Sequence, residues 1–151
     1  MRDAAHERQD FDEADLLHRA RIVRERAYAP YSGFRVGAVV VTEDGHVFEG
    51  ANVENTSYPQ TMCAERVAIG AMVTAGVRSP LSAVAVVGDG QDPCTPCGGC
   101  RQVIFEFGAD TVVLASGDGG RPLVTTIRAL LPHGFGPRRL SQGQHARDDD
   151  A

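Results

Sequence analysis

Apolar residues occur along this chain in two patterns, one spaced as in helices and one in continuous runs. Over residues 12–27 they recur every three to four positions among arginines and acids, which predicts an amphipathic helix capped by Asp10 or Asp12. Residues 34–42 are almost continuously apolar, which predicts a strand buried on both faces. The turn residues Glu43-Asp44-Gly45 then predict a hairpin, with residues 46–51 as the returning strand.

Helical and strand patterns continue to alternate in the rest of the chain. We predict helices over 63–75, 98–107 and 127–131, and strands over 81–87, 111–115 and 122–126. The alternation predicts an α/β fold with helices on both faces of the sheet, and the hairpin makes that sheet mixed rather than purely parallel. The expected architecture is therefore a three-layer α/β/α sandwich around a mixed sheet of about five strands.

The length and the ends of the chain predict a single domain. Its 151 residues suffice to bury a core without disulfides, and we place the domain at 11–140, between flexible tails at 1–10 and 141–151. The charged first ten residues lack the apolar core of a signal peptide, and no apolar run is long enough to cross a bilayer. We therefore expect a cytoplasmic protein with no membrane partner.

Charge and composition exclude several kinds of chemistry. The formal net charge is −5, whereas binding a nucleic-acid backbone calls for a basic surface, so no nucleic-acid partner is expected. All 15 basic residues are arginine, which excludes both a Schiff-base lysine and a phosphate-binding P-loop lysine. In a reducing compartment, the four cysteines indicate metal or redox ligands rather than a disulfide framework.

Two short runs carry most of the candidate chemistry, and each stands at the start of a predicted helix. Cys63 opens one helix, while Cys97 and Cys100 stand three residues apart at the start of another. A helix N-terminus favours the thiolate, which is the form that binds metal. We predict that the three thiolates hold one Zn²⁺ with an open fourth position, the arrangement typical of catalytic zinc; water in that position would have its pKa lowered to roughly 7.

Two charged residues follow Cys63 directly and are candidates for supporting roles. From the first turn of the helix, the Glu65 carboxylate can reach the space beyond the helix end and transfer protons there. Arg66 can offset the excess negative charge of three thiolates by hydrogen bonding to a ligand sulfur. Glu65 could instead simply complement the helix dipole, and Arg66 could be an ordinary surface residue.

Cys94 leaves open a structural interpretation of the same residues. Because Cys94 and Cys97 also have CxxC spacing, Cys94 could supply a fourth sulfur and close the coordination shell. Such a site would stabilise a non-catalytic interaction module. We favour a free Cys94, because it precedes the helix start.

The two cysteine runs, taken with other segments, resemble the small homotetrameric cytidine deaminase family over roughly residues 11–140. The matching segments are Tyr31-Ser32-Gly33-Phe34-Arg35-Val36-Gly37-Ala38, Asn52-Val53-Glu54-Asn55, Cys63-Ala64-Glu65-Arg66, Pro96-Cys97-Gly98-Gly99-Cys100-Arg101-Gln102, Leu130-Leu131-Pro132 and Phe135-Gly136-Pro137. Cys63-Ala64-Glu65 followed by Pro96-Cys97-Gly98-Gly99-Cys100 is similar to the established signature of zinc-dependent deaminases. The resemblance implies hydrolytic deamination of cytidine and 2′-deoxycytidine in pyrimidine salvage, with one zinc ion per subunit.

The resemblance also implies a role for each matching residue. Cys63, Cys97 and Cys100 would bind zinc and Glu65 would transfer protons. The substrate-binding residues would be Asn52 and Glu54 at the ribose 3′-hydroxyl, Phe34 against the nucleoside, the backbone of Ala64 at the pyrimidine, and Tyr58 and Phe135 in the pocket of a neighbouring subunit. A homotetramer with shared pockets is therefore expected.

The chain departs from the family pattern at two points near that expected pocket. Thr56 replaces a usual alanine, and Pro59-Gln60 replaces a usual Gly-Leu pair. A deaminase for a modified cytosine nucleoside, such as blasticidin S, is therefore a second interpretation, although Asn52 with Glu54 favours an ordinary ribose.

Overall fold

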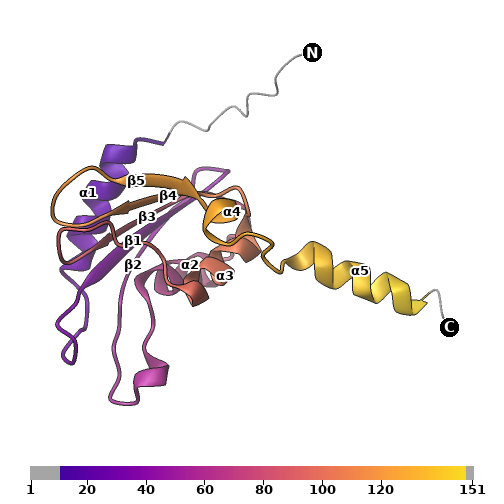
Figure 1. Cartoon of the computed structure of the whole chain (residues 1–151), viewed down its shortest axis with the longest axis horizontal. Coiled ribbons are helices and arrows are strands. Elements are labelled where there is room, and N and C mark those ends of the chain that lie inside the picture. The colour runs from indigo at the N-terminus through magenta and orange to yellow at the C-terminus, as the bar shows by residue number, and fades with distance from the viewer. Residues whose placement is uncertain (1–10, 149–151) are drawn as a thin grey trace, which may run out of the picture.

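A five-stranded mixed sheet forms the centre of the computed structural model, which describes residues 11–148 (Figure 1). The strands lie in the order β2-β1-β3-β4-β5. Their bounds are β1 Val36–Thr42, β2 Val47–Ala51, β3 Leu81–Gly88, β4 Val112–Ser116 and β5 Leu123–Thr126. Only the β3–β4 pair within this sheet is parallel, and the other neighbouring pairs are antiparallel. The predicted mixed sheet and its strands are confirmed.

One face of the sheet is covered by helix α1, Glu13–Arg24. Asp12 is its N-cap, and the Oδ1 atom of Asp12 accepts hydrogen bonds from the backbone N–H groups of Ala14 and Asp15. The helix buries Leu16, Leu17 and Ala20 against one set of sheet residues, among them Val39 and Val41 of β1. Of the two predicted caps, Asp12 is therefore the one that the structure uses.

The opposite face is covered by helices α2, Ala64–Thr74, and α3, Gly98–Phe107 (Figure 1). Ile69 and Met72 of α2 and Ile104 of α3 pack there in a core cluster with Val40 of β1. Since Val39 and Val41 face α1 whereas Val40 faces α2 and α3, strand β1 is buried on both sides, as predicted. The three-layer α/β/α architecture is confirmed.

The C-terminal part of the described chain is helical. A short helix α4, Ile127–Leu130, follows β5, and helix α5, Pro137–Asp148, extends away from the body of the molecule (Figure 1). The predicted flexible tail at 141–151 thus overlaps a helix as far as Asp148, although its flexibility stays a prediction. The predicted tail at 1–10 lies outside the described residues, and so do positions 149–151. No bilayer-spanning helix is found among residues 11–148.

Two polar loops project together from one end of the sheet. Residues 25–35 connect α1 to β1, and residues 52–63 connect β2 to α2 and contain a 3₁₀ turn, η1 Tyr58–Gln60 (Figure 1). An isolated bridge between Tyr28 and Val53 joins them, and a second one between Val53 and Met62 closes the base of the later loop. Both loops therefore lie at the end of the molecule where helix α2 begins.

Helix α1 approaches strand β1 so closely that only a glycine fits at Gly37. A Cβ atom there would lie 2.0 Å from the Ala20 carbonyl oxygen and 2.6 Å from the Arg24 backbone nitrogen. We expect Gly37→Ala to lower the free energy of unfolding by about 3 kcal/mol or more, because α1 must move off the sheet. Urea denaturation measures the change.

Gly70 of α2 provides the matched control for this substitution. It is exposed, and an added Cβ would meet no other atom within 4 Å. Gly70→Ala should therefore raise the free energy of unfolding by up to about 1 kcal/mol, through helix propensity alone. Equal stability of Gly37→Ala and the unaltered protein would contradict the close helix–sheet contact.

Candidate metal centre

Three cysteine sulfurs meet where helices α2 and α3 begin. Cys63 is the N-cap of α2, Cys97 is the N-cap of α3, and Cys100 lies in the first turn of α3. Their three Sγ atoms all lie within 4.8 Å of one another, and those of Cys63 and Cys97 are 3.8 Å apart. The structure thus brings together the three residues that the sequence selected from two segments more than thirty positions apart.

The sulfur geometry fits a tetrahedral zinc ion. With Zn–S bonds of about 2.3 Å, two sulfurs of a tetrahedral site are separated by about 3.8 Å, which is the spacing of Cys63 and Cys97. Thiolate ligands also select zinc over magnesium or calcium, because those two ions prefer oxygen ligands. Three such donors complete all but one position of a tetrahedral shell.

The electrostatics of the cluster favour a bound cation. Hydrogen bonding with Cys100 and Arg66 lowers the pKa of the Cys63 thiol to about 5, despite its partial burial. The same contact with Cys63, together with burial, raises the pKa of Cys100. One thiolate therefore forms readily at neutral pH while its neighbour holds its proton, and a cation among the sulfurs would displace that proton.

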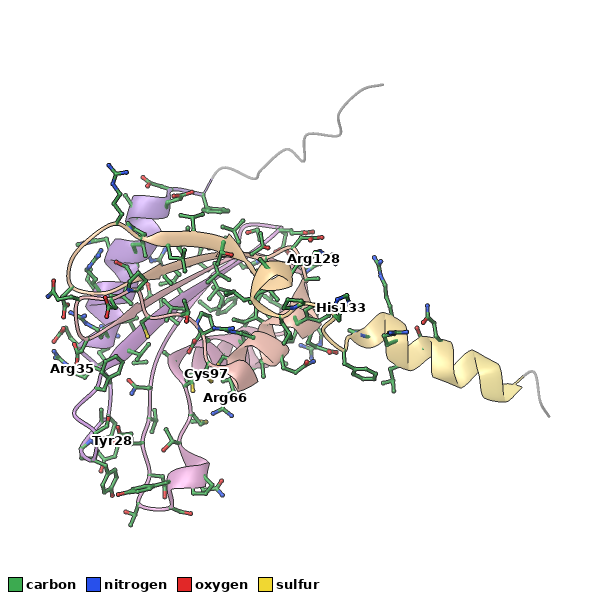
Figure 2. All side chains as sticks on the ribbon, viewed as in Figure 1. Tyr28, Arg35, Arg66, Cys97, Arg128 and His133 are labelled. Carbon is green, nitrogen blue, oxygen red and sulfur yellow. The ribbon has the colours of Figure 1, made fainter. Side chains whose placement is uncertain are left out.

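Arg66 connects the cluster to the loop that precedes α2. Its Nη2 atom lies 3.9 Å from the Cys63 sulfur and donates a hydrogen bond of 2.9 Å to the Thr61 carbonyl oxygen. Figure 2 labels Arg66 and Cys97, which both lie close to the Cys63 sulfur. The guanidinium group thus places a positive charge beside the thiolates, in the position that the sequence analysis gave it.

Glu65 is the acid of the cluster and is only 4% exposed. Burial, with the nearby charge of Cys63, raises the pKa of its carboxyl group above the usual value, while contacts with its own backbone N–H and with Cys100 act in the opposite direction. A carboxyl group with a raised pKa is more readily protonated than an ordinary glutamate, which suits it both to accept and to return a proton. Its side chain therefore has the environment that a proton-transfer group needs.

Cys94 is not a member of the thiol cluster found among the described residues. It is half-buried, and burial raises the pKa of its thiol to about 11, so that it stays protonated at neutral pH. Its sulfur packs instead over Gly88, where an added Cβ would lie 2.8 Å from it and 3.1 Å from the Phe34 ring. The geometry favours three sulfur ligands over four.

The side chains of Asn52 and Glu54 hold the loop before β1. The Oδ1 atom of Asn52 accepts from the Val36 N–H at 2.8 Å, and its Nδ2 donates to the Phe34 carbonyl oxygen at 2.9 Å. The Glu54 carboxylate accepts from the Tyr31 N–H at 2.8 Å and from the backbone N–H and hydroxyl of Ser32. Both side chains are buried, and the Ser32 hydroxyl contributes most to lowering the pKa of Glu54.

Three predicted substrate-binding aromatic residues stand out from the surface. Phe34 is 45% exposed, Tyr58 is 70% exposed at the start of η1, and Phe135 is 60% exposed in the turn before α5. Ala64 is buried, and as the first residue of α2 it presents an N–H group that the helix does not use. These aromatic rings thus remain available to a ligand or a second chain.

Two contacts near these residues were not anticipated from the sequence. The Gln102 side chain, on the same helix as Cys100, donates a 2.7 Å hydrogen bond to the Phe135 carbonyl oxygen. The Tyr31 hydroxyl lies 2.5 Å from the Thr56 hydroxyl. Both pairs are distant in sequence, so no local pattern indicated them.

Gly98 and Gly99, between Cys97 and Cys100, have no atom within 4 Å of an added Cβ, so packing within the chain does not require glycine there.

Comparisons with known proteins agree with this geometry. A family model described as the cytidine and deoxycytidylate deaminase zinc-binding region matches residues 11–116. A cytidine deaminase of Sporosarcina psychrophila is 46% identical over 132 residues, covering 86% of this chain and 96% of the relative. The match to a zinc-binding region and the three clustered thiols together confirm the predicted zinc cofactor.

Solved structures give the same result for the fold. The crystal structure of cytidine deaminase from Burkholderia pseudomallei superposes with a TM-score of 0.79 at 46% identity, covering 83% of this chain and all of that one. Cytidine deaminase from Mycobacterium tuberculosis superposes with a TM-score of 0.71 at 37% identity, covering 84% of this chain and 99% of that chain.

The number of sulfur ligands can be tested by zinc analysis of purified variants. We expect Cys94→Ala to retain about one zinc ion per chain, because its sulfur packs away from the cluster. Cys63→Ala should lose most of its zinc, because two sulfurs remain. Loss of zinc from Cys94→Ala as well would instead indicate a closed site with four sulfur ligands.

Proposed function

The chain belongs to the cytidine and deoxycytidylate deaminase family, and we propose that it converts cytidine and 2′-deoxycytidine to uridine and 2′-deoxyuridine with release of ammonia. The observation that carries this proposal is a buried acid, Glu65, that contacts Cys100 and lies near Cys63 in a cluster of three sulfurs, one fewer than the four ligands of a tetrahedral zinc ion. Such a reaction belongs to pyrimidine salvage.

Zinc in this site would supply an activated water molecule as the nucleophile. Its ligands are Cys63, Cys97 and Cys100, and Arg66 offsets part of their charge through its contact with the Cys63 sulfur. The N-termini of α2 and α3 add positive dipole ends on the same side. These groups keep three thiolates stable next to one another.

Glu65 moves the protons of the reaction. It takes a proton from the attacking water and gives it to N3 of the cytosine ring, which makes C4 more electrophilic. After the oxygen has bonded to C4, Glu65 takes the remaining proton of that new hydroxyl group and passes it to the amino group. The C4–N bond then breaks as the C4=O bond forms, which releases ammonia. One water is consumed for each nucleoside, and Glu65 returns to its starting state.

The substrate is held by residues from both loops. Asn52 and Glu54 bind the ribose 3′-hydroxyl, for which each keeps hydrogen-bonding capacity beyond its backbone partners. Phe34 packs against the nucleoside, and the free backbone N–H at Ala64 contacts the pyrimidine. The two side chains thus position the loop and the ribose at once.

We propose that the pocket is completed by other subunits of a homotetramer. Tyr58 and Phe135 are strongly exposed in the single chain. The broad hollow between the C-terminal end of α3 and the start of α5 includes none of the cysteines. A second copy placing these two rings over the thiol cluster would enclose the substrate. We place the enzyme in the cytoplasm, because its thiols must stay reduced.

The role of Glu65 can be tested with Glu65→Gln. We expect kcat to fall by about 10²- to 10⁴-fold, because the amide cannot transfer a proton, while zinc content stays at about one per chain. Ammonia release and the fall in cytidine absorbance measure the rate. Glu106→Gln, an exposed acid on α3, is the control and should leave the rate unchanged. Near-full activity of Glu65→Gln would refute the proton-transfer role.

The shared pocket can be tested by mixing two chains that are each impaired in a different way, at a cytidine concentration well below the raised KM. Phe135→Ala should raise KM strongly, because it removes a ring that completes a neighbouring pocket. Chains carrying Glu65→Gln keep that ring. Refolding the two together should therefore recover part of the deaminase activity, by forming pockets with Glu65 from one chain and Phe135 from another. No recovery, although mixed tetramers are present by mass spectrometry, would place Phe135 in its own chain's pocket.

A further inference from the structure

Two loops beside the thiol cluster are joined at their tips by side chains that the proposed chemistry does not use. The Tyr31 hydroxyl lies 2.5 Å from the Thr56 Oγ1 atom. The Tyr31 ring meets the Tyr58 ring edge-on, with centroids 5.8 Å apart and planes inclined by 61°. We propose that this Tyr31–Thr56 clasp is a positioning device, which holds Tyr58 in place and thereby sets the affinity for the nucleoside.

The clasp is the last of a series of contacts between the loops. At their base, the Tyr28 N–H donates to the Asn52 carbonyl oxygen and the Glu54 N–H donates to that of Tyr28. Next, the buried Glu54 carboxylate accepts from the Tyr31 N–H. This bond fixes the backbone of Tyr31, so its side chain projects toward Thr56 from an anchored position. The hydroxyl contact therefore extends an ordered base outward to the tip.

The tip depends on the clasp more than the base does. Tyr31 is 47% exposed and Tyr58 is 70% exposed, so burial within the chain contributes little to ordering them. The ring contact between these two residues is an edge-to-face arrangement, which is favourable when the rings are held in register. Releasing the Tyr31 hydroxyl from Thr56 frees the ring that Tyr58 packs against, and Tyr58 then samples other positions.

The catalytic cluster is insulated from this motion. Val53 and Met62 exchange both of their backbone hydrogen bonds at 2.9 Å, which closes the loop before Cys63. Arg66 also holds the Thr61 carbonyl oxygen at 2.9 Å. A change at Thr56 should therefore be contained within the tips of the two loops, and the sulfurs and Glu65 should keep their geometry. The clasp should affect substrate binding without affecting the chemical step.

The effect on binding follows from conformational population. If Tyr58 occupies its productive position only part of the time, the apparent dissociation constant for the nucleoside rises in inverse proportion to that fraction. Without the clasp, Tyr58 must become ordered when the nucleoside binds, and the free-energy cost of that ordering weakens binding. This inference rests on the proposed function, because it takes Tyr58 to be part of a nucleoside pocket.

The test removes the hydroxyl and keeps the shape of the side chain. We expect Thr56→Val to raise KM for cytidine about three-fold, the size expected for one exposed hydrogen bond, with kcat and zinc content unchanged. Thr56→Ser restores the hydroxyl and should return KM to its original value. Tyr31→Phe removes the other hydroxyl and should match Thr56→Val.

A double variant and a neighbouring control separate the clasp from general loop damage. Thr56→Val combined with Tyr31→Phe should raise KM no further than either single change, because both remove the same contact. Ser57→Ala removes an adjacent hydroxyl that does not cap η1, and should leave KM unchanged. Additive effects of the two clasp changes, or equal effects of Ser57→Ala, would overturn the proposal.

Amide hydrogen exchange gives a readout that does not depend on activity. Residues 55–60 should exchange faster in Thr56→Val than in the unaltered protein, while residues 63–74 should not change. If the unaltered protein does not deaminate cytidine, the proposed function fails and exchange still decides whether the clasp orders the tip. If it deaminates cytidine and Thr56→Val keeps the same KM and exchange, the clasp proposal alone fails.

Discussion

The close approach of three cysteine sulfurs is the constraint on which the rest of the structure depends. Sulfurs within 4.8 Å cannot all be thiolates without a cation, because like charges at this distance repel one another. The fold places the N-termini of α2 and α3 and the Arg66 guanidinium beside the sulfurs, which could also hold a zinc ion. The helix starts and Arg66 contribute positive charge at the same point, and a zinc ion would supply the further charge that three thiolates need.

Holding the two helix starts together requires close packing against the sheet. At Gly50 of β2, an added Cβ would lie 2.5 Å from both the Ala64 carbonyl oxygen and the Ala68 nitrogen of α2. The strand therefore rests directly on the backbone of the helix that Cys63 begins. Gly37 plays the same part between β1 and α1 on the other face. Backbone-to-backbone contacts of this kind leave little freedom for α2 to shift, so the position of the Cys63 sulfur is determined by the core.

The loops around the cluster are held by polar side chains rather than by close packing on the sheet. Asn52 and Glu54 are buried and each bonds backbone atoms of the segment before β1, so these two polar residues order a loop that has few apolar contacts. Farther out, the exposed aromatic residues Tyr31 and Tyr58 contact each other, and the Tyr31 hydroxyl contacts Thr56. Burial thus decreases from Asn52 and Glu54 to the loop tips, where the proposed partner subunits would supply further contacts.

The sequence alone determined much of the fold and of the candidate site. The strands, helices α1 to α4 and Asp12 as one of two candidate caps followed from local patterns, whereas helix α5 did not. The spacing of Cys97 and Cys100 at a helix start indicated metal binding from the sequence alone. Local patterns work here because periodicity and capping act over a few residues. Only the tertiary structure decided that Cys94 packs beside Gly88 and Phe34 instead of joining the sulfurs, and that Thr56 meets Tyr31. Those contacts join segments far apart in the chain, and their geometry depends on how the helices and loops pack on the sheet.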